Sequence, residues 1–318
     1  MTSDTNVLSK TQALICEDGD LGLAQIPLPP LAFDQIRIDV KAIGLCRTDL
    51  YAIAGEIPTW SKLFVPGHEF SGVVSEKGSG EIGLAVGDRV VVNPLVSCSE
   101  CGDCKSANGH LCSQTAFMGV DFDGACCDQI TVNQSWAYRI PDSLAFVNAV
   151  FAEPIAATLA ILKANIYPEQ KGLLIGDSRI TELAQRVLIA CKFKNVEVAR
   201  LDQARGLSPD RFDFVIETEA TTAVFVEMAR LVRPRGTMIL KSRQHLPIAL
   251  SLREIIQKEP TISVVNYGRF DHALQLLVDG SVKVDDLVGK QFALDDYADA
   301  LALAAENESK KIFIVPGN

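Results

Sequence analysis

Three features that would place the chain in other protein classes are missing from its 318 residues. No apolar run approaches the ~18 residues that a membrane-spanning helix needs. Residues 1–10 lack the basic and then apolar order of a secretory signal peptide. Basic charge is scarce, because 30 Lys and Arg stand against 40 Asp and Glu, a net charge of −10, with no local basic cluster. We therefore expect no membrane span and no nucleic-acid partner, and a cytoplasmic protein.

Internal repeats, low-complexity stretches and long linkers are also missing. What is present is the composition of a packed globular protein, with 48% hydrophobic and 22% charged residues. A chain of this length suits two lobes of roughly 120–200 residues each.

The first half of the chain has the pattern of short strands. Residues 35–40 alternate polar and apolar side chains, as in a half-buried strand, and residues 89–92 are an apolar strand after a Gly-Asp turn. No segment with a helical period of useful length precedes Asn148. We expect a mostly β region there.

From about Ala149 the pattern changes to strands that alternate with helices. Such an order predicts a parallel sheet, and with the first half an α/β fold class. A mixed tail closes the chain. Expected strands are 173–175, 196–198, 212–216, 237–240 and 311–315, and expected helices are 180–191, 224–232, 270–278 and 297–305, with a turn at 234–236.

Four of the nine cysteines fall in one window, as Cys98-x2-Cys101-x2-Cys104-x7-Cys112. Such short spacings let a single loop present several thiolates to a tetrahedral ion. Four thiolates fill the coordination shell of zinc, so this site would be structural. Unrelated buried cysteines and an iron–sulfur cluster are the alternatives, and the loop lacks the flanking proline of bacterial ferredoxins.

A second, dispersed set contains Cys46, the pair His68 and Glu69, and Glu153. One thiolate, one imidazole and one or two carboxylates make a zinc shell that keeps a position open for water or substrate. Taken alone, each residue has an ordinary explanation: Cys46 as a buried apolar side chain, His68 as a satisfied polar group, and Glu153 as part of a helix start.

The order of these motifs resembles the zinc-dependent alcohol dehydrogenases of the medium-chain dehydrogenase/reductase superfamily, and in particular their polyol, sugar and threonine dehydrogenase branches. The resemblance covers nearly the whole chain. It rests on Cys46-Arg47-Thr48-Asp49, Gly67-His68-Glu69, Gly87-Asp88-Arg89-Val90, the four cysteines, Glu153-Pro154, Arg233-Pro234-Arg235-Gly236 and the closing Lys311-Ile312.

The resemblance implies a β-rich GroES-like catalytic domain over 1–147 and 266–318, and a Rossmann-type NAD(P)-binding domain, a doubly wound parallel sheet, over 148–265. It implies one catalytic and one structural zinc per subunit. Cys46, His68 and a carboxylate would hold the catalytic zinc, with Glu69 and Glu153 exchanging as ligand or second-sphere group. A homodimer or homotetramer is implied in the same way.

Further roles follow from the same resemblance. Thr48 would relay the hydroxyl proton outward, although a local turn hydrogen bond also explains it. Asp49 would orient the His68 ring. Arg47 would meet a cofactor phosphate, although a solvated surface arginine is an equal explanation.

The nucleotide motif departs from the family pattern. A dinucleotide fold carries Gly-x-Gly-x-x-Gly after its first strand, whereas this chain has Gly176-Asp177-Ser178-Arg179-Ile180-Thr181. Ser178 adds a side chain where the phosphates should approach, and Thr181 crowds the strand–helix contact. The helix N-terminus could still bind phosphate through its N–H groups, with Ser178 and Arg179 adding donors; otherwise the lobe binds cofactor poorly.

The type of cofactor stays open. Asp202 at the ribose position would favour NAD, whereas Arg200 would favour NADP by meeting a 2′-phosphate. We expect an oxidoreductase that transfers a hydride between NAD(P) and a secondary alcohol, such as a polyol, sugar or amino alcohol. The alternative is a zinc-stabilised scaffold without turnover. Tyr51, Trp60 and Phe122 are candidates for the substrate pocket from position alone.

Overall fold

The computed structural model of the chain describes residues 9–80, 83–243, 247–306 and 309–317. It divides into two compact units. The first unit contains residues 1–151 and 285–318, and the second unit contains residues 152–284. The expected boundary at 265/266 therefore differs from the one observed. The reason is that helix α9 (Phe270–Val278) packs on α4 (Ala152–Leu159), and both belong to the second unit.

The first unit is built on antiparallel strands. Its main sheet has the order β10-β6-β5-β3-β17-β16, with β9 also pairing β3, and a smaller sheet has the order β2-β1-β4. The core consists mainly of Ile, Val and Leu side chains from the inner faces of these strands. The strands are β1 (Lys10–Glu17), β2 (Asp20–Pro27), β3 (Gln35–Gly44), β4 (Leu63–Phe64), β5 (Glu69–Lys77), β6 (Arg89–Val92), β7 (Leu95–Val96), β8 (Ala116–Phe117), β9 (Gln129–Asn133), β10 (Ala137–Arg139), β16 (Val288–Phe292) and β17 (Lys311–Ile314).

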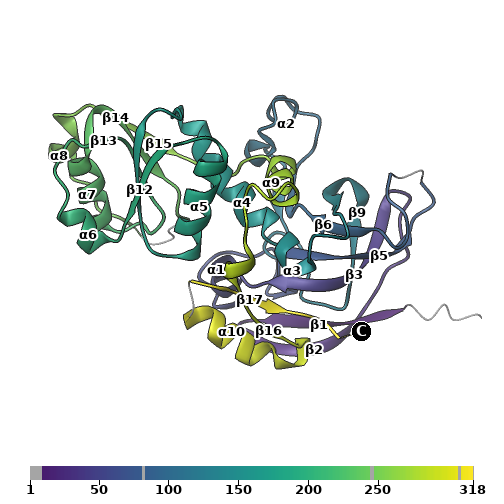
Figure 1. Cartoon of the computed structure of the whole chain (residues 1–318). Helices are drawn as coiled ribbons and strands as arrows, with labels where there is room; N and C mark the ends of the chain where they lie inside the picture. Colours follow the sequence, from purple (N-terminus) through teal and green to yellow (C-terminus); the bar gives the residue numbers. More distant parts are fainter. Residues whose placement is uncertain (1–8, 81–82, 244–246, 307–308, 318) are drawn as a thin grey trace, which may run out of the picture. The chain divides into compact units, whose positions relative to one another are not determined.

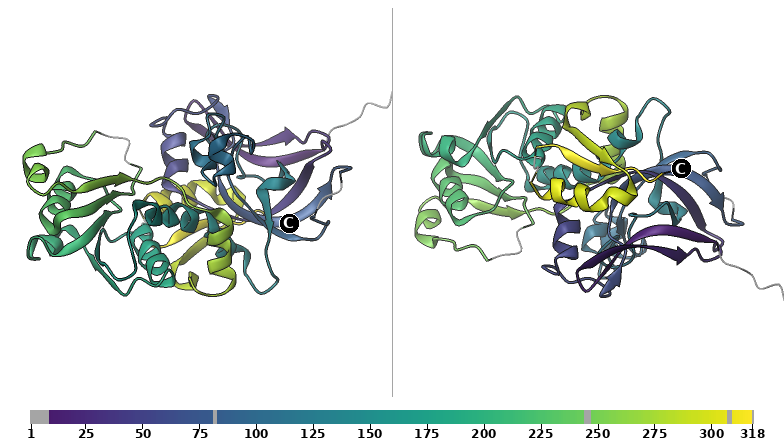
Figure 2. Two further views of the ribbon diagram at one scale, coloured as in Figure 1. Left: turned by 90° about the horizontal axis from the view of Figure 1, so that it is seen from above. Right: turned by 90° about the horizontal axis from the view of Figure 1, so that it is seen from below.

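The last strand of the chain completes the first sheet. β17 pairs antiparallel with the end of β3, so that Phe313 faces Gly44 in the register. Figure 2 shows the C-terminal strands, in yellow, among the purple and blue strands of the same unit. On the other side of β3, the register places Gly44 opposite Glu69, the first residue of β5. The end of β3 thus lies between the start of β5 and the last residues of β17.

The expectation of a region without helices before Asn148 is wrong, because several short helices lie there. α1 (Arg47–Ile53) follows β3 directly, with Cys46 at its N-cap and Asp49 in its first turn. Seven residues are too few for a helical period to stand out in the sequence. The other helices of this unit are α2 (Gly102–Lys105), α3 (Phe146–Ala149) and α10 (Tyr297–Glu306).

The second unit confirms the predicted alternation. Its five strands are all parallel, in the order β12-β11-β13-β14-β15. The residues expected as a turn at 234–236 lie inside β14, at a register shift where Arg235 has a φ of 60°. The elements are η3 (Ala160–Ala164), β11 (Lys171–Ile175), α5 (Arg179–Ala190), β12 (Asn195–Ala199), α6 (Leu201–Arg205), β13 (Phe212–Glu217), α7 (Thr222–Leu231), β14 (Val232–Leu240), α8 (Leu252–Ile256) and β15 (Thr261–Val264).

Helices cover both faces of this sheet (Figure 1). One face packs against α6 and α7, through side chains such as Ala204, Phe225 and Met228. The other face packs against α5 and η3, through side chains such as Leu188 and Ile161. The α/β fold class is therefore confirmed, with a doubly wound parallel sheet in the second unit.

Among the residues that the structure describes, one helical segment of 19 residues, Phe146–Ala164, is long enough for a membrane span and contains an 18-residue window with a mean hydropathy of 1.5. Two-thirds of it is buried inside the chain (67%). Such burial is typical of a core helix of a globular protein.

Candidate functional site

Three of the predicted metal ligands converge in the first unit. Ligand atoms of Cys46, His68 and Glu69 all lie within 4.8 Å of one another. His68 Nε2 is 4.0 Å from Glu69 Oε1. Cys46 comes from the turn between β3 and α1, whereas His68 and Glu69 come from the start of β5, which β3 pairs with directly. The pairing of two neighbouring strands therefore brings together residues that are distant in the sequence.

Asp49 fixes the orientation of the His68 ring, as the resemblance implies. Its Oδ1 lies 2.9 Å from His68 Nδ1 and accepts the Gly67 N–H at 3.0 Å, while its Oδ2 accepts the Cys46 N–H at 2.9 Å. With Nδ1 held by the carboxylate, Nε2 is the atom that faces Glu69. Phe117 packs against the imidazole, with ring centroids 4.9 Å apart.

Asp49 and His68 shift each other's pKa. Burial alone would raise the pKa of Asp49, but the His68 charge and the hydrogen bonds from His68, Cys46 and Gly67 together lower it. Burial opposes the charged form of His68, but Asp49 and Cys46 raise the pKa of the imidazole well above its usual value. Each group therefore favours the charged form of the other.

Sequence reasoning missed the partner of Glu69. The Glu69 Oε2 atom pairs with Lys311 Nζ, and both side chains are 1% exposed. Gly44 lies between them in the sheet, and a Cβ at this position would come within 2.8 Å of the Lys311 side chain and 3.0 Å of Glu69 Oε2. The one sign of this ion pair in the sequence is a lysine at the start of the apolar strand Lys-Ile-Phe-Ile, where a charged side chain needs a partner if it is buried.

The donor set fits zinc. Thiolate, imidazole Nε2 and carboxylate Oε1 are the ligand types that zinc takes in open sites. Binding of zinc would displace a proton from the imidazole, because a metal ligand needs a free lone pair.

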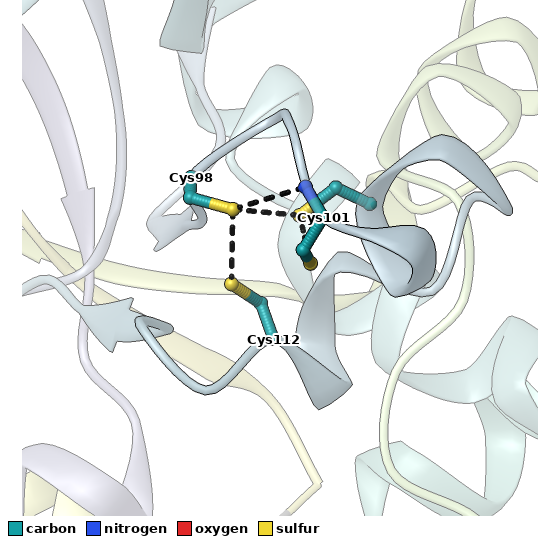
Figure 3. Close-up of side chains that lie close together, drawn as sticks. Cys98, Cys101 and Cys112 are labelled. Atoms are coloured by element: carbon teal, nitrogen blue, oxygen red, sulfur yellow. Dashed lines mark hydrogen bonds between the residues drawn. The ribbon is translucent and has the colours of Figure 1, made fainter.

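The four-cysteine loop forms the second metal-ligand group. The Sγ–Sγ distances are 3.5 Å for Cys101–Cys104, 3.5 Å for Cys98–Cys112 and 3.8 Å for Cys98–Cys104. Four sulfurs at about 2.3 Å from a tetrahedral zinc are about 3.8 Å apart, so the loop is already shaped for the ion. Figure 3 shows the thiols of Cys98, Cys101 and Cys112 turned toward one another.

The protonation of this loop is uneven. The backbone N–H groups of Glu100 and Cys101, with the Cys112 thiol, lower the pKa of Cys98 to about 6. The neighbouring Cys104 thiol and the partial burial of the loop raise the pKa of Cys101 to about 11, although the Cys104 N–H opposes this shift. A cation would therefore meet the thiolate form of Cys98 more readily than that of Cys101.

Comparisons with known proteins identify dehydrogenases as relatives of this chain. Residues 33–142 match the family model of the alcohol dehydrogenase GroES-like domain. The chain is similar to medium-chain dehydrogenases/reductases of the polyol dehydrogenase type. Sorbitol dehydrogenase of Bacillus subtilis is 28% identical, over 93% of this chain and 94% of its own length. L-threonine 3-dehydrogenase of Burkholderia thailandensis is 23% identical, over 92% of this chain and 95% of its own.

A solved structure shows the same fold. The short-chain alcohol dehydrogenase rspB of Escherichia coli CFT073, solved with NADH, superimposes with a TM-score of 0.86 at 22% identity, over 96% of this chain and 99% of that one. These relatives are dehydrogenases and do not favour the alternative of a non-catalytic scaffold.

The dinucleotide loop of this dehydrogenase-like chain lies in the second unit, at the carboxyl end of β11. Gly176 has a φ of 152°, and a Cβ there would come within 2.2 Å of Thr218 Oγ1. Thr181 was expected to crowd the contact between strand and helix. It is instead accommodated there, since it is buried and its Oγ1 lies 2.7 Å from Thr218 Oγ1. Two backbone N–H groups of the loop already donate hydrogen bonds within the chain. Asp177 N–H donates to Glu219 Oε1 at 3.1 Å, and Ser178 N–H donates to Thr181 Oγ1 at 3.2 Å. The loop does not fit a pyrophosphate while Glu219 is in this position.

The other predicted cofactor residues lie beside this loop or in the first unit. Arg200 is the N-cap residue of α6 and pairs with Asp202, with Nη2–Oδ2 at 3.2 Å, so the residues predicted to favour NADP and NAD bind each other. Arg179 begins α5. Arg47 is exposed on α1 of the first unit.

The remaining candidates stay predictions. Thr48 is half-buried in the first turn of α1. Glu153 is buried in the first turn of α4 and belongs to the second unit, and its role as a zinc ligand is untested. Among the pocket candidates, Trp60 is 54% exposed and Phe122 packs on Trp136 with centroids 5.8 Å apart.

Proposed function

We propose that the protein is a zinc-dependent oxidoreductase that interconverts a secondary alcohol and its carbonyl compound. The observation that carries this proposal is the convergence of Cys46, His68 and Glu69, whose ligand atoms lie within 4.8 Å of one another in an otherwise buried part of the first unit. A three-residue set leaves a position for substrate, in contrast to the closed four-thiolate loop.

Each protein group at this centre has a task. A zinc ion held by these three residues would act as a Lewis acid that polarises an alcohol or carbonyl oxygen. Asp49 holds the imidazole with Nε2 toward the metal position. Lys311 holds one oxygen of Glu69 and leaves the other free to face His68. Thr48, next to Asp49 in α1, is our candidate for moving the hydroxyl proton.

The finer assignments rest on the family. The relatives named above act on sorbitol and on L-threonine, and they support a polyol, sugar or amino alcohol as the substrate class. NAD or NADP is the implied redox partner, with zinc at two sites per subunit. A homodimer or homotetramer and a cytoplasmic location remain predictions of the same kind.

Metal analysis and an alcohol screen test this proposal together. The purified protein should hold about two zinc ions per chain. It should change nicotinamide absorbance with at least one member of a panel of polyols, sugars and threonine. Cys46→Ser should lose one zinc and the activity and keep the fold. Cys191→Ser is the matched control, because this half-buried thiol lies at the end of α5, outside both metal groups.

The opposite result is equally clear. If the wild type and Cys46→Ser contain the same amount of zinc, or if the zinc-loaded wild type oxidises none of the panel with either nucleotide, the proposed function is wrong.

A further inference from the structure

The two central strands of the second unit end at the place where this fold class binds ligands. β11 and β13 are neighbours in the sheet, and the chain leaves β11 toward β12 on one side, whereas β13 leads toward β14 on the other. In doubly wound sheets, ligands bind outside the carboxyl ends of the strands at this switch point. Here the two carboxyl ends continue into Gly176 and into Thr218-Glu219.

The donors that would meet a phosphate at this point are satisfied by the protein itself. The N-terminus of a helix normally offers unpaired N–H groups and a partial positive charge to an anion. Before α5, however, Asp177 N–H donates to the carboxylate of Glu219, at 3.1 Å. The loop therefore already binds an anion, and this anion is a side chain of the same chain.

A chain of hydroxyl groups holds the next donor. Thr218 Oγ1 donates to the Ile175 carbonyl at 3.3 Å, Thr181 Oγ1 lies 2.7 Å from Thr218 Oγ1, and Ser178 N–H donates to Thr181 Oγ1 at 3.2 Å. Thr181 stands where the family pattern has its third glycine. The hydroxyl that replaces this glycine thus takes over one of the N–H groups of the turn.

The Glu219 carboxylate also lies close to Gly176. A Cβ built on Gly176 would lie 3.4 Å from Glu219 Oε1, so the carboxylate reaches across the mouth of the glycine turn itself. The same Oε1 atom accepts the Asp177 N–H, so the carboxylate oxygen lies close to both residues of the turn.

Arg200, a cation that follows β12, is already paired with a carboxylate. Arg200 pairs with Asp202, and Asp177 adds a second negative charge in its surroundings, so both carboxylates raise the pKa of the guanidinium. A nucleotide diphosphate would bring negative charge to a place that already holds the carboxylates of Asp177 and Glu219.

We propose that Glu219 is a built-in competitor of the cofactor, whose carboxylate fills the pyrophosphate position of the Gly176 turn and must leave before a nucleotide diphosphate binds. This inference rests on the proposed function for the identity of the ligand. The binding of a nicotinamide nucleotide is then an exchange of one anion for another on the Asp177 N–H, and its affinity is set by residue 219.

Binding of ADP to the full-length protein, measured by titration calorimetry, tests the proposal without turnover. ADP carries the diphosphate and lacks the nicotinamide. Glu219→Gln keeps a side chain of equal size and removes the charge, and Glu219→Ala removes the competitor entirely. Both should lower the Kd of ADP by about tenfold or more, whereas adenosine, which has no phosphate, should bind all variants equally.

Glu259→Gln is the matched control. Glu259 is 73% exposed and precedes β15, so it lies at the amino ends of the strands, away from the glycine turn. Glu259→Gln removes the same unit of charge as Glu219→Gln and should leave the Kd of ADP unchanged. This control separates the local effect of residue 219 from the effect of the net charge of the chain.

The outcomes distinguish this proposal from the proposed function. Tighter ADP binding in Glu219→Gln and not in Glu259→Gln supports the competitor role even if no alcohol is oxidised. Tight binding of ADP to the wild type that Glu219→Gln leaves unchanged or weakens overturns the competitor role, even if the enzyme is active. Failure of ADP to bind both Glu219 variants overturns it as well.

Discussion

Lys311 and Glu69 are 242 residues apart in the chain and form an ion pair in which each side chain is 1% exposed. The ammonium group also lies 5.8 Å from the centroid of the Phe151 ring. Removing two charges from water is costly, and the pair offsets this cost only while both members are present. Strand β5 and the last strand, β17, are therefore coupled through Glu69, which is a candidate metal ligand.

We predict that Lys311→Met destabilises the metal-free first unit by roughly 3–5 kcal/mol, because it leaves the buried Glu69 carboxylate without its lysine partner. The double variant Lys311→Met with Glu69→Gln should recover most of this loss, since it buries no charge. Urea unfolding followed by tryptophan fluorescence measures both, because Trp60 and Trp136 belong to the first unit. Equal stabilities of the single and double variants would show that the pair does not couple.

The Asp49–His68 pair predicts a pH dependence of the metal-free protein. The pKa of His68 is raised, so its contribution to stability is complete below the unfolded value of about 6.5 and is lost as the pH rises through the higher native value. The pKa of Asp49 is lowered, so its contribution is present above the unfolded value of about 3.9 and is lost as the pH falls through the lower native value.

The stability difference between the wild type and His68→Gln should therefore be largest between about pH 4 and pH 6.5 and should shrink at higher pH. Urea unfolding in the presence of a chelator measures it. Zinc affinity should change in the opposite direction and rise with pH, because the metal displaces the proton of His68. A stability difference that grows above pH 8 would contradict the assigned charge states.

Much of the fold was predictable because its signals are local. The Cys98–Cys112 window needs only one loop, and α5 shows its buried face in Leu183, Ala184 and Val187 at helical spacing. α9 was predicted with the bounds that the structure has. α1 was missed because a seven-residue helix carries hardly two turns of pattern.

The contacts that decide the chemistry were not predictable, since they depend on strand register and loop position. Nothing near Glu69 in the sequence points to Lys311, and only the pairing of β3 with both β5 and β17 brings them together. Glu219 likewise meets Asp177 across 42 residues, through the adjacency of β11 and β13. The altered glycine motif showed where the family pattern fails, but it did not show which side chain occupies the turn.

The four-cysteine loop gives the last prediction. Cys112 is the buried member of the set and joins the end of η1 (Gly109–Leu111) to the turn at Cys98, with their sulfur atoms 3.5 Å apart. Cys112→Ser should lower the zinc content from about two ions per chain to about one and should expose the loop to proteolysis, because three thiolates no longer close the shell. The zinc at Cys46 and His68 should remain. The ion that Cys112→Ser loses should be the same one that a thiol-reactive chelator removes from the wild type while the zinc at Cys46 stays bound. If Cys112→Ser keeps all its zinc, or loses both ions together, the two metal groups are not independent and the structural role of the loop is wrong.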